Sequence, residues 1–447
     1  MIVALGFLCV VALLFGLPLF IGLGTLGTLY QFNNTTALGA GSFGEITRQL
    51  TVVFSDPLSK LTGDQSALFL TIPYFTLTGY LIAHSQFATR VVSLYLMLMK
   101  RVGKIGTLGL GVVCIVIAAL FTPLTGASGV TIVAIGGILF PILTGAGYSE
   151  KRALGLITAS GSIGLLFSPS LPVMLFGIMS ENKADINELY RAGVLPGLIL
   201  LIALSVVVLL NSFRSGAASA EALREHLSAA AFTGKDAVKL TTELAAIPLL
   251  YLLMHSRFMV ITELGVFFLL YYFLLEVVVF REIGFQKLAK VFEEAIAMIG
   301  SIILIIFFAM ILTNALLYDG VPAKLFGFIS QYIHSPLTFL MLLNIFLLIV
   351  GALMDIFSAI IVIVPLIIPI AESYQIPMLH LGILFLTNLE IGYLTPPVGL
   401  NLFLSSLRFQ KPMSDIYKSI VPYLIALLIA QIVITYVPWL SLWWKNG

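Results

Sequence analysis

The sequence predicts an all-α polytopic membrane protein, built as an inverted-topology repeat with two re-entrant helical hairpins and two broken transmembrane helices. Three observations predict this fold. The chain is 60% hydrophobic and only 10% charged, whereas a globular protein carries roughly 25% charged residues. Two apolar runs are about twice as long as one membrane span needs to be. Two further spans contain prolines in the middle, where a continuous helix cannot form.

Composition also excludes several function classes. The net charge is only +2, so nothing suggests a nucleic-acid partner. Cys9 and Cys114 both lie in apolar runs and build no disulfide framework or metal motif. The chain has no Walker A motif, so direct use of ATP is not expected. No nucleophile–base pair accompanies the apolar runs, and we do not expect an enzyme.

Single spans follow from apolar runs separated by charged loops. The N-terminal run Ile2–Leu23 lacks a basic first segment and a clear cleavage site, so we interpret it as a spanning helix and not a signal peptide. The other predicted single spans are Ser66–Ala83, Gly193–Asn211, Phe258–Phe280, Ala295–Tyr318 and Ile420–Leu440. Thr242–Met254 is too short to be assigned as a full span.

The two double-length runs, 105–144 and 335–370, each carry a polar, Gly-containing interruption near the middle. Each run is compatible with two crossings or with one re-entrant hairpin, because both bring the ends to the same side. Length favours hairpins: Ser335–Val350 and Ala359–Ile370 fall short of the roughly 20 residues that a crossing requires.

Two spans, 153–177 and 381–407, contain prolines flanked by polar residues. Pro396 and Pro397 remove two backbone donors, so the helix must open there. Backbone opened at membrane depth survives only inside protein or along a polar cavity. A proline-kinked structural helix is the alternative interpretation, and the paired breaks in the two halves favour a broken helix.

Charge placement sets the predicted orientation. Most Lys and Arg residues lie in one set of loops, which the positive-inside rule assigns to the cytoplasm. The N-terminus is then cytoplasmic, and the C-terminus lies outside. An amphipathic segment precedes each hairpin, at Ser85–Lys100 and Pro322–Ile333. Residues 1–213 and 258–447 thus form two units of like order and opposite orientation, joined by a cytoplasmic linker and connecting helix at 214–257.

Oxygen-rich interruptions predict two cation sites. Hydroxyls, amides and freed carbonyls are hard ligands that suit a weakly held Na⁺. One hairpin tip and one broken helix per half would build each site. We assign Gly126, Ser128, Ser160 and Ser162 to the first site and Asp355, Gly392 and Thr395 to the second. Ser170 and Asn401 are expected to be substrate-side donors. Any single Ser or Thr has an alternative role in helix–helix hydrogen bonding.

Asp355 and Glu390 are the two carboxylates placed at membrane depth. Such groups are energetically expensive and usually functional. Structural pairing, or a position nearer the interface, would also explain either one. Two other classes stay open: an intramembrane enzyme using both as an acid/base pair, and a scaffold subunit with no transport path. No second catalytic motif supports the enzyme, and the paired polar breaks argue against the scaffold.

Two stretches resemble a known family. Gly-Ala-Leu-Met-Asp-Ile-Phe-Ser at 351–358 and Ile-Gly-Tyr-Leu-Thr-Pro-Pro-Val-Gly-Leu-Asn-Leu-Phe at 391–403 are similar to the large membrane subunit of tripartite ATP-independent periplasmic (TRAP) transporters. The first half departs from the family pattern, because Ser170 and Leu171 separate Pro169 from Pro172. That departure affects the ligand assignment of the first cation site.

The resemblance implies an elevator-type transporter of the bacterial inner membrane, similar to the ion transporter superfamily. It implies Na⁺-coupled import of a small organic acid, such as a C4-dicarboxylate or a sialic acid. A small four-helix membrane subunit and a periplasmic substrate-binding protein would be its partners, within the lipid bilayer. A self-sufficient Na⁺/organic anion symporter, without a binding protein, is the alternative.

Overall fold

The computed structural model describes residues 21–29, 43–62, 66–102, 105–126, 128–181, 183–213, 232–255, 259–318, 320–396 and 399–445. Every regular element within these ranges is a helix. The prediction of an all-α fold is confirmed. Most of the predicted first span and residues 214–231 of the predicted linker lie outside the described residues.

The first half contains a hairpin of two helices and a bent helix, in the predicted order. Its helices are α3 (Phe43–Thr62), α4 (Ser66–His84), α5 (Phe87–Val102), α6 (Ile105–Thr125), α7 (Ser128–Gly145), α8 (Glu150–Ile163), η1 (Gly164–Leu166), α9 (Leu171–Met179) and α10 (Ile186–Phe213). The axes bend by 45° between α8–η1 and α9. The break therefore falls at Phe167–Ser170, where Pro169 removes a backbone donor.

Helix α12 (Gly234–His255) leads into the second half. That half contains α13 (Ile261–Phe273), its π-helical continuation η2 (Leu274–Val279), α14 (Phe285–Tyr318), α15 (Val321–Ile329), α16 (Pro336–Leu353), α17 (Ile356–Ser373), α18 (Met378–Gly392), α19 (Leu400–Phe409), α20 (Met413–Tyr436) and α21 (Trp439–Leu442). The order α14 to α20 repeats the order α4 to α10. Opposite orientation of the halves, and the boundaries at 213 and 258, stay predictions.

Seven described helices are long and apolar enough to cross a membrane, and the bent pair α8–α9 adds an eighth candidate. Helix α16 shows how such a helix faces its surroundings. Leu337, Met341, Ile345 and Ile349 repeat every four residues and are all exposed. A stripe of this kind on a helix surface faces lipid and not water.

Several helices differ from the sequence prediction: α10 and α20 each begin seven residues earlier than predicted, at Ile186 and Met413, and two larger differences concern α3 and α14. Helix α3 was not predicted, because charged and polar residues interrupt its apolar pattern. Helix α14 begins at Phe285, ten residues before the predicted span at Ala295. Its first turns carry Lys287, Lys290, Glu293 and Glu294, which lower the hydropathy without ending the helix. Hydropathy therefore located the apolar part of this helix and not its start.

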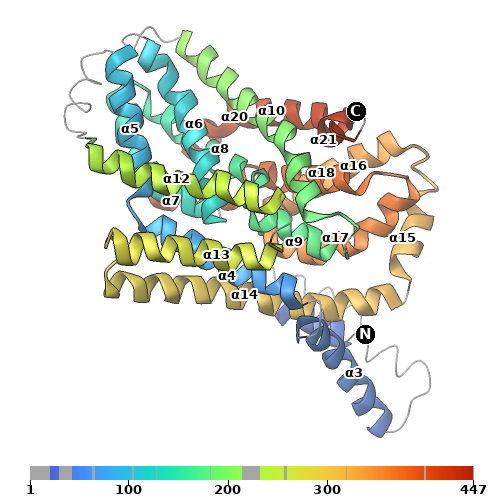
Figure 1. The fold of residues 1–447 in the computed structure, drawn as a ribbon. Helices are drawn as coiled ribbons and strands as arrows, with labels where there is room; N and C mark the ends of the chain where they lie inside the picture. The colour runs from blue at the N-terminus through green and yellow to red at the C-terminus, as the bar shows by residue number, and fades with distance from the viewer. Residues whose placement is uncertain are drawn as a thin grey trace.

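The helices form two regions. Helices α4, α13 and α14 lie side by side as one layer (Figure 1). The hairpins and bent helices pack together on the other side, and the two halves interlock there. Helix α7 of the first hairpin packs on α19 of the second half, and α17 of the second hairpin packs on α9 of the first. Each hairpin is therefore held by the other half's broken helix.

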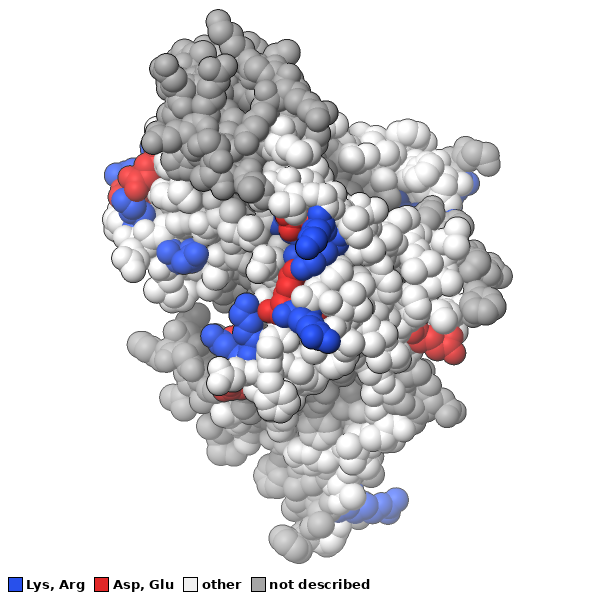
Figure 2. Space-filling model, turned by 60° about the vertical axis from the view of Figure 1, so that its left-hand side comes forward, with Lys and Arg blue, Asp and Glu red and all other residues white. Residues whose placement is uncertain are grey.

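Charged side chains are sparse on the surface. On the face shown in Figure 2, charged side chains lie singly or in small groups, and most of the described surface carries no Lys, Arg, Asp or Glu. A buried charged cluster lies at the amphipathic helix α5. The buried Arg90 donates to Glu243 of α12 and, at 2.6 Å, to Glu282. Burial disfavours the charged form of Glu282, but hydrogen bonds from Arg90 and Lys239 outweigh burial and lower its pKa.

Candidate functional site

The first hairpin tip meets the first break through backbone contacts. Gly126 adopts a φ of +68°, a left-handed conformation that glycine tolerates without strain. A Cβ atom at Gly126 would lie 2.7 Å from Leu171 Cδ1, just past the break. Gly161 of α8 packs against the carbonyl of Ser128, where a Cβ would come within 3.4 Å. The small residues therefore let the tip and the bent helix approach closely.

The backbone of the first break is hydrogen-bonded by a tyrosine on a different helix. The hydroxyl of Tyr190, on α10, donates to the carbonyl of Ser170 and accepts from its amide N–H, each at 3.0 Å. Both backbone groups of Ser170 are thus satisfied by one side chain. The hydroxyls of Ser162, Ser168 and Ser170 are buried and have no hydrogen-bond partner within the described residues. Oxygens of this kind are available to a ligand.

The second tip and the second break are joined even more directly. The Asp355 carboxylate caps α17 by accepting from the amide and the hydroxyl of Ser358. The amide of Gly399 donates to the carbonyl of Ala352 at 3.1 Å. The Tyr393 hydroxyl accepts the Ile356 amide hydrogen. A Cβ atom at Gly392 would lie 2.6 Å from Gly351 Cα, so two backbones touch here.

One hydrogen bond links a residue of the first predicted cation site to a residue predicted to bind the substrate. Ser128, at the first tip, donates to Asn401 Oδ1 at 2.8 Å, and both residues are buried. Asn401 follows the second break on α19, and its Nδ2 has no partner among the described residues. The structure therefore brings a residue predicted for the first cation site together with a residue predicted for substrate.

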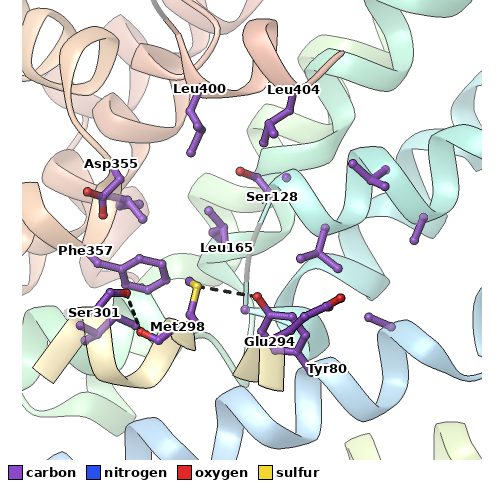
Figure 3. A pocket seen from close by; sticks show the side chains of 18 of the residues that line it. Tyr80, Ser128, Leu165, Glu294, Met298, Ser301, Asp355, Phe357, Leu400 and Leu404 are labelled. Carbon is purple, nitrogen blue, oxygen red and sulfur yellow. Dashed lines mark hydrogen bonds between the residues drawn. The ribbon is translucent and has the colours of Figure 1, made fainter. Parts of the chain in front are cut away.

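A cavity of about 740 Å³ lies between the two hairpin tips and the layer that contains α4 and α14. Ser128 and Asp355 lie on one side of it, and Tyr80, Glu294 and Met298 lie on the other (Figure 3). Gly126 and Tyr393 also line it. Both hairpin tips thus face one space. The cavity is mostly apolar, with a few polar groups at its edges, which is typical of a small-molecule site.

The other predicted site residues lie around this cavity without lining it. Ser160 donates to the carbonyl of Ile157 at 3.3 Å, and the Ser162 hydroxyl has no partner in the part of the chain that the structure describes. These two side chains are two positions apart on α8, so they point to different faces of the helix. Thr395 donates to the carbonyl of Ile391 at 3.0 Å. Ligation by Ser160, Ser162, Gly392, Thr395 and the other assigned residues stays a prediction.

The sequence analysis missed four side chains that shape the site. Tyr190 and Tyr393 hold the breaks. His84 Nε2 lies 3.5 Å from the Glu294 carboxylate on the cavity wall opposite the tips, where Lys290 approaches Glu294 at 3.8 Å. A tyrosine within an apolar run belongs to no sequence motif, so the roles of Tyr190 and Tyr393 could not be predicted. The pairing of His84 with Glu294 spans more than 200 residues, so no local pattern signals it.

Comparison with known proteins identifies the family. Residues 6–440 match the family model described as the tripartite ATP-independent periplasmic transporter, DctM component. The C4-dicarboxylate TRAP transporter large permease protein DctM of Pseudomonas aeruginosa is 30% identical over 375 residues, which cover 83% of this chain and 85% of the relative. The protein of the same name from Vibrio cholerae is 27% identical, covering 99% of this chain and 97% of the relative.

Two further matches extend the comparison. The isethionate TRAP transporter permease protein DctMQ of Oleidesulfovibrio alaskensis is 26% identical, covering 95% of this chain and 63% of that longer protein. Among solved structures, the YdaH transporter of Alcanivorax borkumensis superimposes with a TM-score of 0.65 at 12% identity, covering 96% of this chain and 100% of that one. This likeness supports the fold alone. The chain belongs to the DctM-component family of TRAP transporters, as a multi-pass membrane transport protein and not an enzyme.

Proposed function

We propose that this protein imports a small organic acid across the bacterial inner membrane, driven by a Na⁺ gradient. A periplasmic binding protein delivers the solute, and a small four-helix membrane subunit completes the transporter. The observation that carries the proposal is the single cavity faced by both hairpin tips. Relatives named for C4-dicarboxylates and for isethionate support a small organic anion as the solute class.

Two Na⁺ ions provide the coupling in this proposal. The first binds where Gly126 and Ser128 meet α8, and the second binds where Asp355 meets Gly392 and Thr395. The buried hydroxyl of Ser162 on α8, which has no hydrogen-bond partner within the described residues, supports the first assignment. A carboxylate and a backbone opened by proline support the second, because hard oxygen ligands suit this ion.

The proposed transport movement displaces one of the two regions of the fold against the other. The hairpins and broken helices, interlocked across the halves, move as one unit against the layer of α4, α13 and α14. The cavity between them carries the solute. The proposed orientation places the N-terminus in the cytoplasm and the C-terminus in the periplasm, in accord with the distribution of Lys and Arg.

The experiment is solute uptake into proteoliposomes that contain this protein and its small membrane subunit. An inward Na⁺ gradient is applied, with and without the cognate periplasmic binding protein, using a panel of C4-dicarboxylates, sialic acids and sulfonates. Uptake that requires Na⁺ and the binding protein is the expected result. Uptake driven by Na⁺ alone would establish the self-sufficient symporter, and uptake without Na⁺ dependence would contradict the coupling.

Thr395→Val tests the second cation site. Valine keeps the shape of threonine and removes the hydroxyl oxygen, so the Na⁺ dependence of uptake should weaken while membrane insertion is unaffected. Thr387→Val is the matched control. The Thr387 hydroxyl also donates to a carbonyl of its own helix, that of Ile383 at 2.8 Å, and Thr387 lies eight residues before Thr395. Unchanged Na⁺ activation in the Thr395 variant would remove Thr395 from the site.

A further inference from the structure

The charged cluster around Arg90 joins α5 to α12 and to the segment that follows η2. Arg90 donates through Nε to Glu243 Oε2 at 3.0 Å, and through Nη2 to the other oxygen of the same carboxylate. Its Nη1 donates to Glu282 Oε1 at 2.6 Å, and Lys239 donates to that oxygen at 2.8 Å. Glu243 and Glu282 therefore both accept hydrogen bonds from cationic side chains.

Glu276 is a third carboxyl group in this cluster, and it has no such donor. Among the six residues of η2 only Glu276 is buried, so its side chain points into the protein. Neither of its oxygens has a hydrogen-bond partner in the part of the chain that the structure describes. Arg90 Nη2 lies 3.9 Å from Glu276 Oε1, which is beyond hydrogen-bond distance.

The charges of the cluster balance only when Glu276 is neutral. Arg90 and Lys239 carry two positive charges, and Glu243 and Glu282 carry two negative charges. An ionised Glu276 would add one negative charge without a cation to compensate it. The side chains of Glu243 and Glu276 are both 0% exposed, and an uncompensated charge at such depth is strongly unfavourable.

Contact between two carboxyl groups locates the proton. The side chains of Glu243 and Glu276 lie within hydrogen-bonding reach of each other, and two carboxyl groups this close cannot both be ionised. Both oxygens of Glu243 already accept from Arg90. The proton therefore belongs on Glu276, whose O–H group can donate to a Glu243 oxygen.

The remaining groups near η2 have other partners or face outward. Tyr271 and Tyr272 of α13 donate to backbone carbonyls of α12, at 2.6 and 2.9 Å. Helices α4 and α14 contribute the apolar Leu81 and Val291 to the packing of η2. Their titratable groups on the cavity wall interact with Glu294, and these are Tyr80, His84 and Lys290. The exposed charged groups on the neighbouring elements are Lys235, Arg281, Lys287 and Glu293.

This cluster fastens the corner at which the chain leaves α4 and enters α5. The amide of Gln86, at that corner, donates to Glu282 Oε2 at 3.2 Å. Arg90 is the fourth residue of α5, and α5 leads directly into the first hairpin, α6–α7. The contacts that hold the corner end on Glu243 and Glu282, and an ionised Glu276 would repel both carboxylates and compete for Arg90. The attachment of α5 therefore depends on the charge of Glu276.

We propose that Glu276 is a proton-binding site whose proton, donated to Glu243, keeps helix α5 fastened to α12. When the proton is lost, the O–H bond of the acid breaks, its electron pair stays on the carboxylate oxygen, and the proton passes to water or hydroxide. The new negative charge then loosens the hold of the cluster on Arg90. The cluster is thus a pH-sensitive clamp, whichever solute and coupling ion the protein uses.

The first test measures how stability depends on pH. A folded protein that keeps a proton which the unfolded chain releases loses stability as pH rises, by about tenfold in the folding equilibrium constant per pH unit. The loss begins above the pKa of an unfolded glutamate, about 4.3, and continues while the folded protein holds the proton. Denaturant unfolding in detergent, from mildly acidic to alkaline pH, should show it. Glu276→Gln should flatten the slope, because the amide can donate to Glu243 and cannot ionise.

The matched control is Glu372→Gln, which should keep the slope because Glu372 is an exposed carboxylate paired with Lys183. Equal slopes in the unaltered protein and in Glu276→Gln would overturn the proposal. If Glu276→Gln does not fold, Glu276→Met provides a neutral side chain of similar length. If neither folds, the infrared band of protonated carboxylic acids is followed in Glu390→Gln protein, which lacks the other buried carboxyl group without a partner. A band that is unchanged between neutral and alkaline pH would then overturn the proposal.

The second test measures the attachment of α5 directly. Hydrogen exchange of the amides of residues 87–102 is compared between the unaltered protein and Glu276→Gln at the same pH, where the same amides have equal intrinsic exchange rates. At alkaline pH these amides should exchange faster in the unaltered protein, by up to about tenfold per pH unit, and at mildly acidic pH the two proteins should be equal. The amides of α20, in the other region of the fold, are the internal control and should not differ. Equal exchange of α5 at both pH values would overturn the proposed clamp.

Discussion

The two hairpin tips perform the same structural task with different chemistry. The first tip turns through Gly126 and is surrounded by hydroxyl groups, with no carboxylate. The second tip carries a carboxylate, Asp355, which caps α17. The first break is held by Tyr190 from an outer helix, whereas the second is held by its own Tyr393. Repeated element order therefore does not imply repeated chemistry, because only the second tip carries a carboxylate.

Backbone contact distinguishes Gly392, at the second break, from Gly161 of α8, which faces the first tip. Gly392→Ala should lower the free energy of unfolding by about 3 kcal/mol, because the new Cβ would meet Gly351 backbone that cannot rotate away. Gly161→Ala should cost about 1 kcal/mol or less. Its Cβ would meet the movable side chain of Ile132, and alanine favours the helix.

Thermal unfolding in detergent measures both changes. Gly300→Ala is the matched control, because a Cβ at Gly300 of α14 would have no atom of the described residues within 4 Å. Equal destabilisation by the Gly392 and Gly161 variants would show that the second break is no more tightly packed than the first.

Capping gives the next largest effect. Asp355→Ala removes the N-cap of α17 and should destabilise the protein by about 1–2 kcal/mol. It should also reduce Na⁺-dependent uptake, since it removes the carboxylate assigned to the second cation site. No acidic residue exists at the first tip to remove.

Ser335→Ala separates the two roles of Asp355. Ser335 caps α16 by accepting from the Thr338 amide at 3.2 Å, at the end remote from the tip. It should lower stability by a similar amount and leave Na⁺ activation unchanged. Loss of Na⁺ activation in both variants would mean that stability alone explains the Asp355 effect.

The hydrogen bond between Ser128 and Asn401 joins the first half of the chain to the second half. A double-mutant cycle of Ser128→Ala and Asn401→Ala should give a coupling free energy of about 1 kcal/mol. Both single variants should also reduce uptake, because both residues lie at the proposed sites.

The bond between Thr158 and Ser405, at 2.8 Å, is the matched control. It also connects the halves and is buried, yet it belongs to no proposed site. Its cycle should give a similar coupling energy without a change in Na⁺ dependence. A coupling near zero for Ser128 and Asn401 would show that their hydrogen bond does not stabilise the contact between the halves.

The amphipathic helices give the smallest predicted difference. Helix α5 is fixed by the buried Arg90 and Glu282, whereas Lys324 of α15 is exposed. The pKa of Glu282 is lower when folded, so its contribution to stability is present above its unfolded pKa and is lost as pH falls through the folded value. Glu282→Gln should therefore reduce stability at neutral pH, by about 1 kcal/mol, and reduce it less in acid.

Unfolding midpoints at neutral and acidic pH measure this difference. Glu372→Gln should show almost no change, because its pair with Lys183 is exposed. A pH-independent loss in Glu282→Gln would show that packing, and not charge, explains the role of this residue.

The fold could be predicted because its signals are local. Pro396 and Pro397 exclude a continuous helix, whereas the choice of hairpins over two crossings stays a prediction, because α7, α16 and α17 are each 18 residues long and apolar enough to cross a membrane. The helix pairs α6–α7 and α16–α17 occur at the predicted positions, as do both breaks. Helix α3 has no comparable apolar signal, and the structure was needed to find it.

The site could be predicted only in part. Tip residues are identifiable as polar groups in apolar runs, and both tips do face one cavity. Which partner each residue takes is a long-range property. Ser128 and Asn401 are 273 positions apart, and Arg90 and Glu243 are 153 apart. Neither spacing follows from helical periodicity, so these contacts require the folded structure.

The interlocked packing of the two halves has a genetic consequence. Gly129, Gly136 and Gly137 of α7 accommodate Leu404, Phe409 and Arg408 of α19, and Arg408 donates to the Val133 carbonyl at 3.0 Å. A larger residue at Gly129 or Gly137 would meet Leu404 or Arg408, so its suppressors are expected more than 250 positions away, whereas Gly136 faces both Ile157 of its own half and Phe409.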